Sequence, residues 1–132
     1  MRADIERRLL QLAVAFTCLV PLSAATLSLW RGPDWLGSGG GSTDLDSHFR
    51  YLSGIFLALG IGFATCIPAI ERRGPRFRLL AALVVAGGLG RLASLVVVGA
   101  PSVGHLAGLA IELGVVPLLT FWQARVARQA RS

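Results

Sequence analysis

Two ionisable side chains of opposite sign lie inside stretches of sequence that are otherwise apolar. Arg91 occupies the run LLAALVVAGGLGRLASLVVVG, and Glu112 occupies the run VGHLAGLAIELGVVPLLTF. A charge near the middle of a bilayer costs about 2.5–3.5 kcal/mol on insertion scales, so it usually has a partner or a role there. We therefore expect Arg91 and Glu112 to form a salt bridge inside a membrane protein.

The depths of the two charges support this pairing. Arg91 lies seven residues before Val98, about 10 Å from the end of its run. Glu112 lies nine residues after Val103, about 13 Å from the same end. The short connection 99–102 makes the two runs antiparallel neighbours, and an arginine side chain spans the small remaining difference. A bidentate bridge between them would lower the cost of burying both groups.

Further polar residues are expected toward the outer surface of the membrane. His105 precedes Glu112 by seven residues and therefore lies on nearly the same helix face. The stretch DSHFRY places Asp46, His48 and Arg50 at the outer mouth of another apolar run. The predicted ligand-binding set is Arg91, Glu112, His105, His48, Arg50 and Asp46.

Three interpretations of the bridge stay open. It can belong to a polar pocket that binds a ligand, it can be a structural clasp that fixes the register of two helices, or it can contact another subunit. For the histidines, the alternative to a role in binding or proton transfer is that of interfacial residues that only form hydrogen bonds.

The sequence contains no motif that indicates catalysis. HExxH, a nucleophile elbow, a P-loop and a dinucleotide fingerprint are all missing. Cys18 and Cys66 occupy different apolar runs without CxxC spacing, so we expect two buried thiols and not a redox or metal site. We predict no catalytic residue and no metal ligand, no cofactor is indicated, and a non-enzymatic role is favoured.

Four apolar runs must position these side chains. They cover residues 9–29, 51–70, 79–98 and 103–122, and each has about the 20 residues that a bilayer core requires. Lipid offers no hydrogen-bond partners to the backbone, so the runs are predicted to be helices. We therefore expect an all-α, integral membrane four-helix up-and-down bundle in a single domain, 1–132. The long connection, residues 30–50, is rich in glycine and serine and is expected to be an external loop.

The arginines orient these helices. Ten of them flank the N-terminus, the 71–78 loop and the C-terminus, whereas only Arg31 and Arg50 lie on the other side. The positive-inside rule therefore predicts that both termini and the 71–78 loop are cytoplasmic. A cleaved signal peptide ending near Ser23-Ala24-Ala25 is the alternative, but the apolar run that continues to Leu29 is longer than a typical signal core.

Composition agrees with a membrane protein. The 132 residues are 54% hydrophobic and 15% charged, whereas a soluble domain is about 45–50% apolar and about a quarter charged. The net charge is +6, yet the arginines flank apolar runs and do not form one continuous basic surface. We therefore expect the lipid bilayer, and not a nucleic acid, as the partner of these charges.

Several stretches of the chain resemble a known family. DSHFRYLSGIFLALGIGF, CIPAIERRG, RFRLLAALVVAGGLGRLASL and VGAPSVGHLAGLAIELGVVPLLTFWQARVAR are similar to domain-of-unknown-function family 4345, over about residues 44–128. This resemblance implies a small bacterial four-helix protein of the inner (cytoplasmic) membrane with no settled activity. It carries over to Asp46, His48, Arg50, Arg91 and Glu112. More distantly, the layout is similar to DoxX/DoxD-like proteins, some of which are associated with quinone-linked redox complexes.

Three functions follow as hypotheses. The first is a binding or accessory module whose polar outer half holds a small amphiphile, such as a quinone- or lipid-like molecule. The second is a small proton-coupled transporter in which Glu112 alternates between a protonated and a paired state. The third is a membrane subunit of a redox complex. Each is compatible with a homodimer or with a partner membrane protein.

Overall fold

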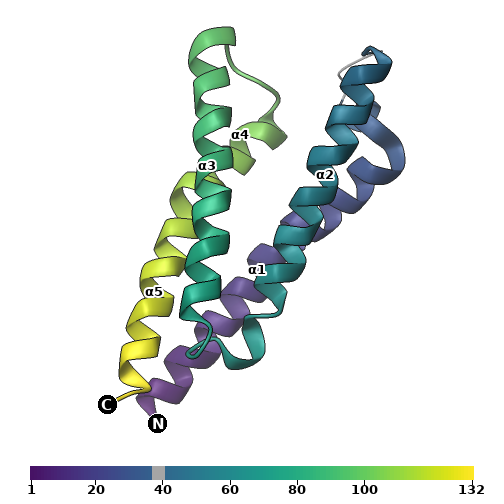
Figure 1. The fold of residues 1–132 in the computed structure, drawn as a ribbon. Helices are drawn as coiled ribbons and strands as arrows, with labels where there is room; N and C mark the ends of the chain where they lie inside the picture. The colour runs from purple at the N-terminus through teal and green to yellow at the C-terminus, as the bar shows by residue number, and fades with distance from the viewer. Residues whose placement is uncertain (37–40) are drawn as a thin grey trace. The chain divides into compact units, whose positions relative to one another are not determined.

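The computed structural model describes residues 1–36 and 41–132, and every regular element in those residues is helical. Four helical stretches are long and apolar enough to cross a membrane: Arg2–Leu36, Thr43–Ala69, Gly74–Val98 and Val103–Gln129. The prediction of an all-α chain with four membrane-spanning candidates is confirmed (Figure 1). The cytoplasmic placement of the termini stays a prediction.

The chain packs as two compact units. The first part of α1 belongs to unit 1 and its second part to unit 2. Unit 1 comprises residues 1–13 and 66–132, and unit 2 comprises residues 14–65. The expectation of one membrane domain remains a prediction. In chain order the elements are α1 (Arg2–Arg31), η1 (Gly32–Leu36), α2 (Thr43–Ala64), η2 (Ile67–Ala69), α3 (Gly74–Val98), α4 (Val103–Ala110), η3 (Ile111–Val115) and α5 (Val116–Gln129).

Unit 2 pairs the second part of α1 with α2, which runs back along it (Figure 1). Gly60 allows the two helices to approach, because a Cβ atom there would lie only 3.2 Å from side-chain atoms of Pro21 and Leu22. Small residues at such points are the usual means by which helices pack closely in a membrane. At the far end, the indole N–H of Trp35 donates to the hydroxyl of Ser28 at 3.0 Å and holds η1 against α1.

The helix α2 begins earlier than the apolar pattern indicates. Residues 43–50, expected in the external loop, form its first two turns. The hydroxyl of Ser42 caps this helix by accepting a hydrogen bond from the Leu45 N–H at 3.2 Å, and Asp44 and Asp46 in the first turn complement the helix dipole. The part of the expected loop at 37–40 lies outside the described residues.

Unit 1 packs α3 against η3 and α5, and the first turns of α1 and the segment before α3 complete it. Gln123 is fully buried and donates to the Ile70 carbonyl at 2.8 Å. Gln11 donates to the Ile67 carbonyl at 2.7 Å. Carbonyl groups at the end of a helix or in a short turn have no partner within the helix, so two glutamines from different helices satisfy them here.

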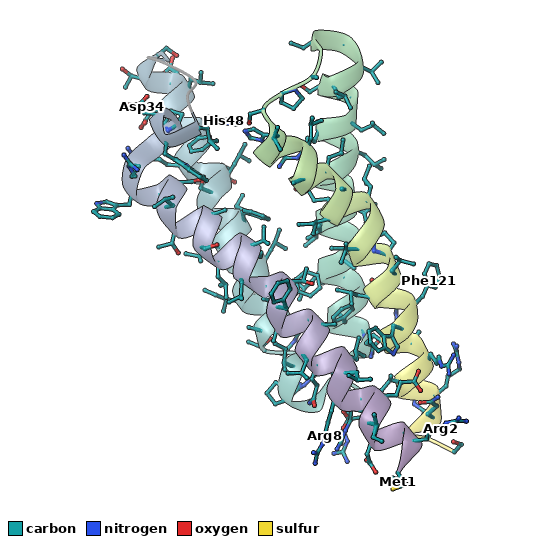
Figure 2. All side chains as sticks on the ribbon, turned by 180° about the vertical axis from the view of Figure 1, so that it is seen from behind. Met1, Arg2, Arg8, Asp34, His48 and Phe121 are labelled. Carbon is teal, nitrogen blue, oxygen red and sulfur yellow. The ribbon has the colours of Figure 1, made fainter. Side chains whose placement is uncertain are left out.

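The outward faces of the helices in unit 1 are apolar. Phe121, for example, is 74% exposed and projects away from α5 (Figure 2). Other large apolar residues with high exposure in this unit are Leu79, Leu83 and Leu118. Exposed apolar side chains of this kind suit contact with lipid.

The three arginine clusters of the sequence lie at one end of unit 1. The two chain termini and the connection before α3 meet at that end (Figure 1), and Arg2 and Arg8 extend from it (Figure 2). Segments that are far apart in the sequence therefore present their positive charges together. This is the arrangement on which the positive-inside prediction depends.

Candidate functional site

The salt bridge predicted from the sequence is present in unit 1. Arg91 on α3 donates from Nε to Glu112 Oε2 at 3.0 Å and from Nη2 to Glu112 Oε1 at 3.1 Å. The glutamate side chain is only 10% exposed and that of the arginine 31%. A bidentate pair with a nearly buried carboxylate is the strong, geometrically specific form of this interaction.

His105 on α4 joins the pair. Its Nδ1 lies 2.5 Å from Arg91 Nη1. Arginine can only donate, so Nδ1 must accept and the imidazole hydrogen is assigned to Nε2. We call Arg91, Glu112 and His105 the arginine triad. Its members come from α3, η3 and α4, in that order.

An irregular helical segment carries Glu112. Between α4 and α5, residues Ile111–Val115 form a π-helix, with the Val116 N–H bonded to the Ile111 carbonyl. Pro117 lies two residues after this segment and has no N–H to continue an α-helical pattern, and in a regular α-helix its ring would crowd the carbonyl of Leu113. The wider π turn relieves that conflict. Such segments occur frequently at functional sites.

Close approach of α3 to the π-helix brings the partners together. A Cβ atom at Gly88, one turn before Arg91, would lie 2.8 Å from Leu113 Cδ2 and 2.9 Å from Glu112 Cβ, so a larger residue does not fit without a shift. A Cβ at Gly108 would lie 3.8 Å from Arg91 Cζ, which is ordinary van der Waals contact. Glycine at 108 therefore leaves the guanidinium open on that side.

Two other predicted site residues form a separate cluster in unit 2. Arg50 donates from Nε to Asp46 Oδ2 at 2.9 Å and from Nη1 to the carbonyl of Leu29. The second bond ties the first part of α2 to the end of α1, whose last carbonyls lack helical partners, and the first holds the guanidinium in place. Gly32 follows α1 with a φ of +69°, and a Cβ there would lie 2.7 Å from Asp46 Oδ1.

His48, the remaining predicted residue, stacks on Tyr51 with ring centroids 6.4 Å apart. The structure thus gathers Arg91, Glu112 and His105 in unit 1, and joins Asp46 to Arg50 in unit 2. A single site containing all six residues stays a prediction.

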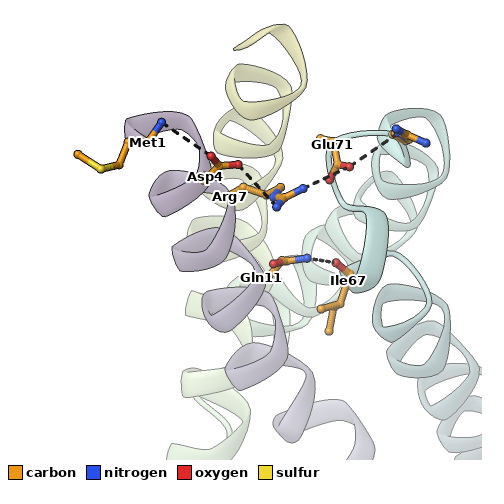
Figure 3. Close-up of polar contacts among 7 residues, drawn as sticks. Met1, Asp4, Arg7, Gln11, Ile67 and Glu71 are labelled. Atoms are coloured by element: carbon orange, nitrogen blue, oxygen red, sulfur yellow. Dashed lines mark hydrogen bonds and ion pairs between the residues drawn. The ribbon is translucent and has the colours of Figure 1, made fainter. Parts of the chain in front are cut away.

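The residues at the arginine-rich end, expected from the sequence only to orient the helices, also form a network of ion pairs. There, Glu6 pairs with Arg125 at 2.8 Å and accepts a hydrogen bond from Gln129 at 2.9 Å. Nearby, Arg7 lies between Asp4 and Glu71 (Figure 3). The alternation of acidic and basic residues in DIERR and in IERRG was the signal that could have indicated this network.

No metal centre is formed by the described residues. Within residues 1–36 and 41–132, no group of three or more His, Cys, Asp or Glu is placed to hold a metal ion. Cys18 and Cys66 are both buried, as predicted from their apolar surroundings.

The family comparison agrees with the resemblance carried by the motifs of the sequence. The family model described as domain of unknown function (DUF4345) matches residues 9–123, a stretch that contains both helices of the Arg91–Glu112 bridge. The chain belongs to this family. No curated protein and no solved structure matches the DUF4345 chain. The distant similarity to DoxX/DoxD-like proteins and the bacterial origin stay predictions.

Proposed function

We propose that the protein is a membrane-embedded binding or accessory module whose arginine triad holds the polar head of a small amphiphile. The observation that carries this proposal is the incomplete use of Arg91. A guanidinium has five N–H groups, and Glu112 and His105 engage three of them. The two that remain belong to a side chain that is 31% exposed.

The chemistry of the remaining groups defines the ligand. Arg91 offers N–H donors, and His105 offers its Nε2–H in the tautomer assigned above. The charges of Arg91 and Glu112 cancel, so a neutral ligand leaves the site without net charge, whereas an anion would add one in a region where charge is costly. A neutral head with carbonyl acceptors, as in a quinone or an ester-linked lipid, fits both requirements.

Transport is the alternative that involves Glu112 most directly. A proton-coupled cycle would require the carboxylate to leave Arg91, and both of its oxygens are bonded to that residue. The π-helix favours this alternative, because such segments occur frequently at functional sites. A membrane subunit of a redox complex would bind the same kind of ligand as the proposed binding module. It would differ from that module only in having a partner protein.

The first experiment is mass spectrometry of small molecules that co-purify with the protein in mild detergent. Wild type is compared with Glu112→Gln, which removes the charge of the bridge, and with Gly108→Leu, which covers the open side of the guanidinium. Gly104→Leu is the matched control, since a Cβ at Gly104 meets nothing within 4 Å.

A specific neutral amphiphile should accompany wild type and Gly104→Leu and be absent from Glu112→Gln and Gly108→Leu. The same lipids in all four samples would make the triad a structural clasp. Proton flux in liposomes that is abolished by Glu112→Gln would instead support the transporter.

A further inference from the structure

A second candidate site lies at the arginine-rich end of unit 1, away from the arginine triad. A surface cleft of about 450 Å³ opens between the first turns of α1, the segment before α3 and the end of α5. Arg7, Arg72 and Arg131 line it, one from each of these three segments, together with Asp4 and Glu71. Its apolar wall includes Val126 and Ala127.

The donors of Arg7 are not satisfied by the protein. Its Nη2 lies 3.7 Å from Asp4 and its Nη1 lies 3.9 Å from Glu71 (dashed lines in Figure 3). Both distances exceed those of hydrogen bonds. Arg72 is 84% exposed, and its ion pair with Glu71 is also 3.9 Å long. The guanidinium groups therefore keep N–H donors for an acceptor from outside the chain.

The charges around the cleft leave one positive charge in excess. Three arginines face two carboxylates. The cleft therefore suits a group with a single negative charge, such as a phosphodiester.

The inner part of the cleft lies at the level of the headgroup layer of a membrane. Arg7 lies just before the apolar run that starts at residue 9, Glu71 follows directly after the run that ends at residue 70, and Val126 lies four residues beyond the run that ends at residue 122. At 1.5 Å per residue these positions are only about 2–6 Å beyond the apolar runs, and the headgroup region is roughly 5–7 Å thick on each side. A phosphate at this level would be that of a lipid whose acyl chains contact the apolar surface of the helices.

We infer that this cleft binds the phosphodiester headgroup of an anionic phospholipid. Arg7, Arg72 and Arg131 donate to the phosphate oxygens, and the apolar wall at Val126 and Ala127 receives the glycerol end of the acyl chains. Basic pockets between membrane helices on the cytoplasmic side bind anionic lipids in this way. The site is independent of the arginine triad.

The test uses the full chain in detergent micelles, with dioleoyl phosphatidylglycerol as the probe and native mass spectrometry to measure its dissociation constant. The double substitution Arg72→Gln with Arg131→Gln removes two charges from the cleft. The matched control, Arg2→Gln with Arg8→Gln, removes two charges from exposed residues at the same end that do not line it. A second variant, Ala130→Leu, narrows the cleft at an exposed lining residue without changing charge.

The cleft variant should weaken binding by about 10- to 30-fold, as expected for two arginines at a membrane surface, and the control should change it by less than about twofold. Ala130→Leu should also weaken binding, while dioleoyl phosphatidylcholine should bind wild type less tightly than phosphatidylglycerol. Equal losses in both double variants, or equal binding of the two lipids, would overturn the proposal. Competition by inorganic phosphate at the affinity of the lipid would overturn the assignment to a lipid. Melting temperatures measured without added lipid check that each variant is folded.

Discussion

At the scale of single residues, the burial of the Arg91–Glu112 bridge determines how the protein should respond to substitution. Glu112 is 10% exposed and both of its oxygens accept hydrogen bonds from Arg91. If one residue of the pair is replaced, the other loses these hydrogen bonds, and its charge still bears the free-energy cost of removal from water. The intact pair, in contrast, is often no more stable than apolar residues of the same size.

Glu112→Gln should therefore lower the free energy of unfolding by about 3–5 kcal/mol, because it leaves the charge of Arg91 unpaired. The double substitution Arg91→Met with Glu112→Leu should recover much of this loss. A double-mutant cycle of unfolding in detergent measures both effects. Independent, additive contributions of the two residues would contradict a coupled bridge.

Gly88 offers a second prediction at this scale. Gly88→Ala should lower the free energy of unfolding by about 1–3 kcal/mol, because the added methyl group overlaps Leu113 and the Cβ of Glu112. Gly87→Ala is the control, since a Cβ there meets nothing within 4 Å. It should be neutral or stabilising by up to about 1 kcal/mol. Thermal unfolding of both variants checks this, and equal effects would show that α3 does not depend on close approach at Gly88.

At the scale of elements, two irregular features hold side chains in place. The π-helix Ile111–Val115 presents Glu112 to α3. In unit 2, Arg50 and Asp46 join α2 to the end of α1 next to the left-handed Gly32. The π-helix gives up regular α-helical hydrogen bonds, and the left-handed backbone at Gly32 restricts which residue can stand there. The contacts that each feature makes possible must offset this cost in free energy.

Pro117→Ala tests the origin of the π-helix. Alanine supplies an N–H that can bond to the Leu113 carbonyl, so a regular α-helix becomes available. A change of one residue in register rotates Glu112 relative to α5 by about 100° and should move it away from Arg91.

We expect the coupling energy between Arg91 and Glu112 to fall by at least about half in the Pro117→Ala background, measured by repeating the double-mutant cycle there. Pro21→Ala in α1 is the control and should leave the coupling unchanged. Full coupling in the Pro117→Ala protein would show that the proline does not determine the position of Glu112.

At the scale of the whole molecule, the distribution of charge and apolar surface determines how the chain meets a bilayer. Four helices are long and apolar enough to cross it. Ten of the thirteen basic residues belong to the two terminal segments and the connection before α3, and these three segments meet at one end of unit 1. Positive charge near the ends of membrane helices favours the cytoplasmic side.

When the protein is expressed in a bacterial inner membrane, both termini should therefore be cytoplasmic. Fusions of a cytoplasmic fluorescent reporter to either end should be bright, and fusions of a periplasmic phosphatase to either end should be inactive. Replacing the four arginines of residues 72–78 with glutamine should weaken this preference, because it removes the charge between the second and third spans. Active phosphatase fused to an unmodified terminus would show that the orientation is inverted.

Much of the fold and part of the site could be predicted from the sequence. Apolar runs of about 20 residues require helices, since lipid satisfies no backbone groups. The pairing of Arg91 with Glu112 follows because a short connection fixes the relative depth of two neighbouring helices. His105 follows because seven residues are about two helical turns.

Other features depend on which helix faces meet, and the sequence alone does not specify this. Gly87 and Gly88 are equivalent in the sequence, but only a Cβ at Gly88 would meet the π-helix. Arg50 bonds to carbonyl groups at the end of α1, about twenty residues away in the sequence, and also holds Asp46. The cleft at Arg7 exists because three segments that are distant in the chain converge there. The sequence by itself determined the class of protein and the Arg91–Glu112 bridge, because these depend on local composition and on depth in the membrane. Only the tertiary structure decided the close contacts and the cleft, because these depend on how distant segments of the chain pack together.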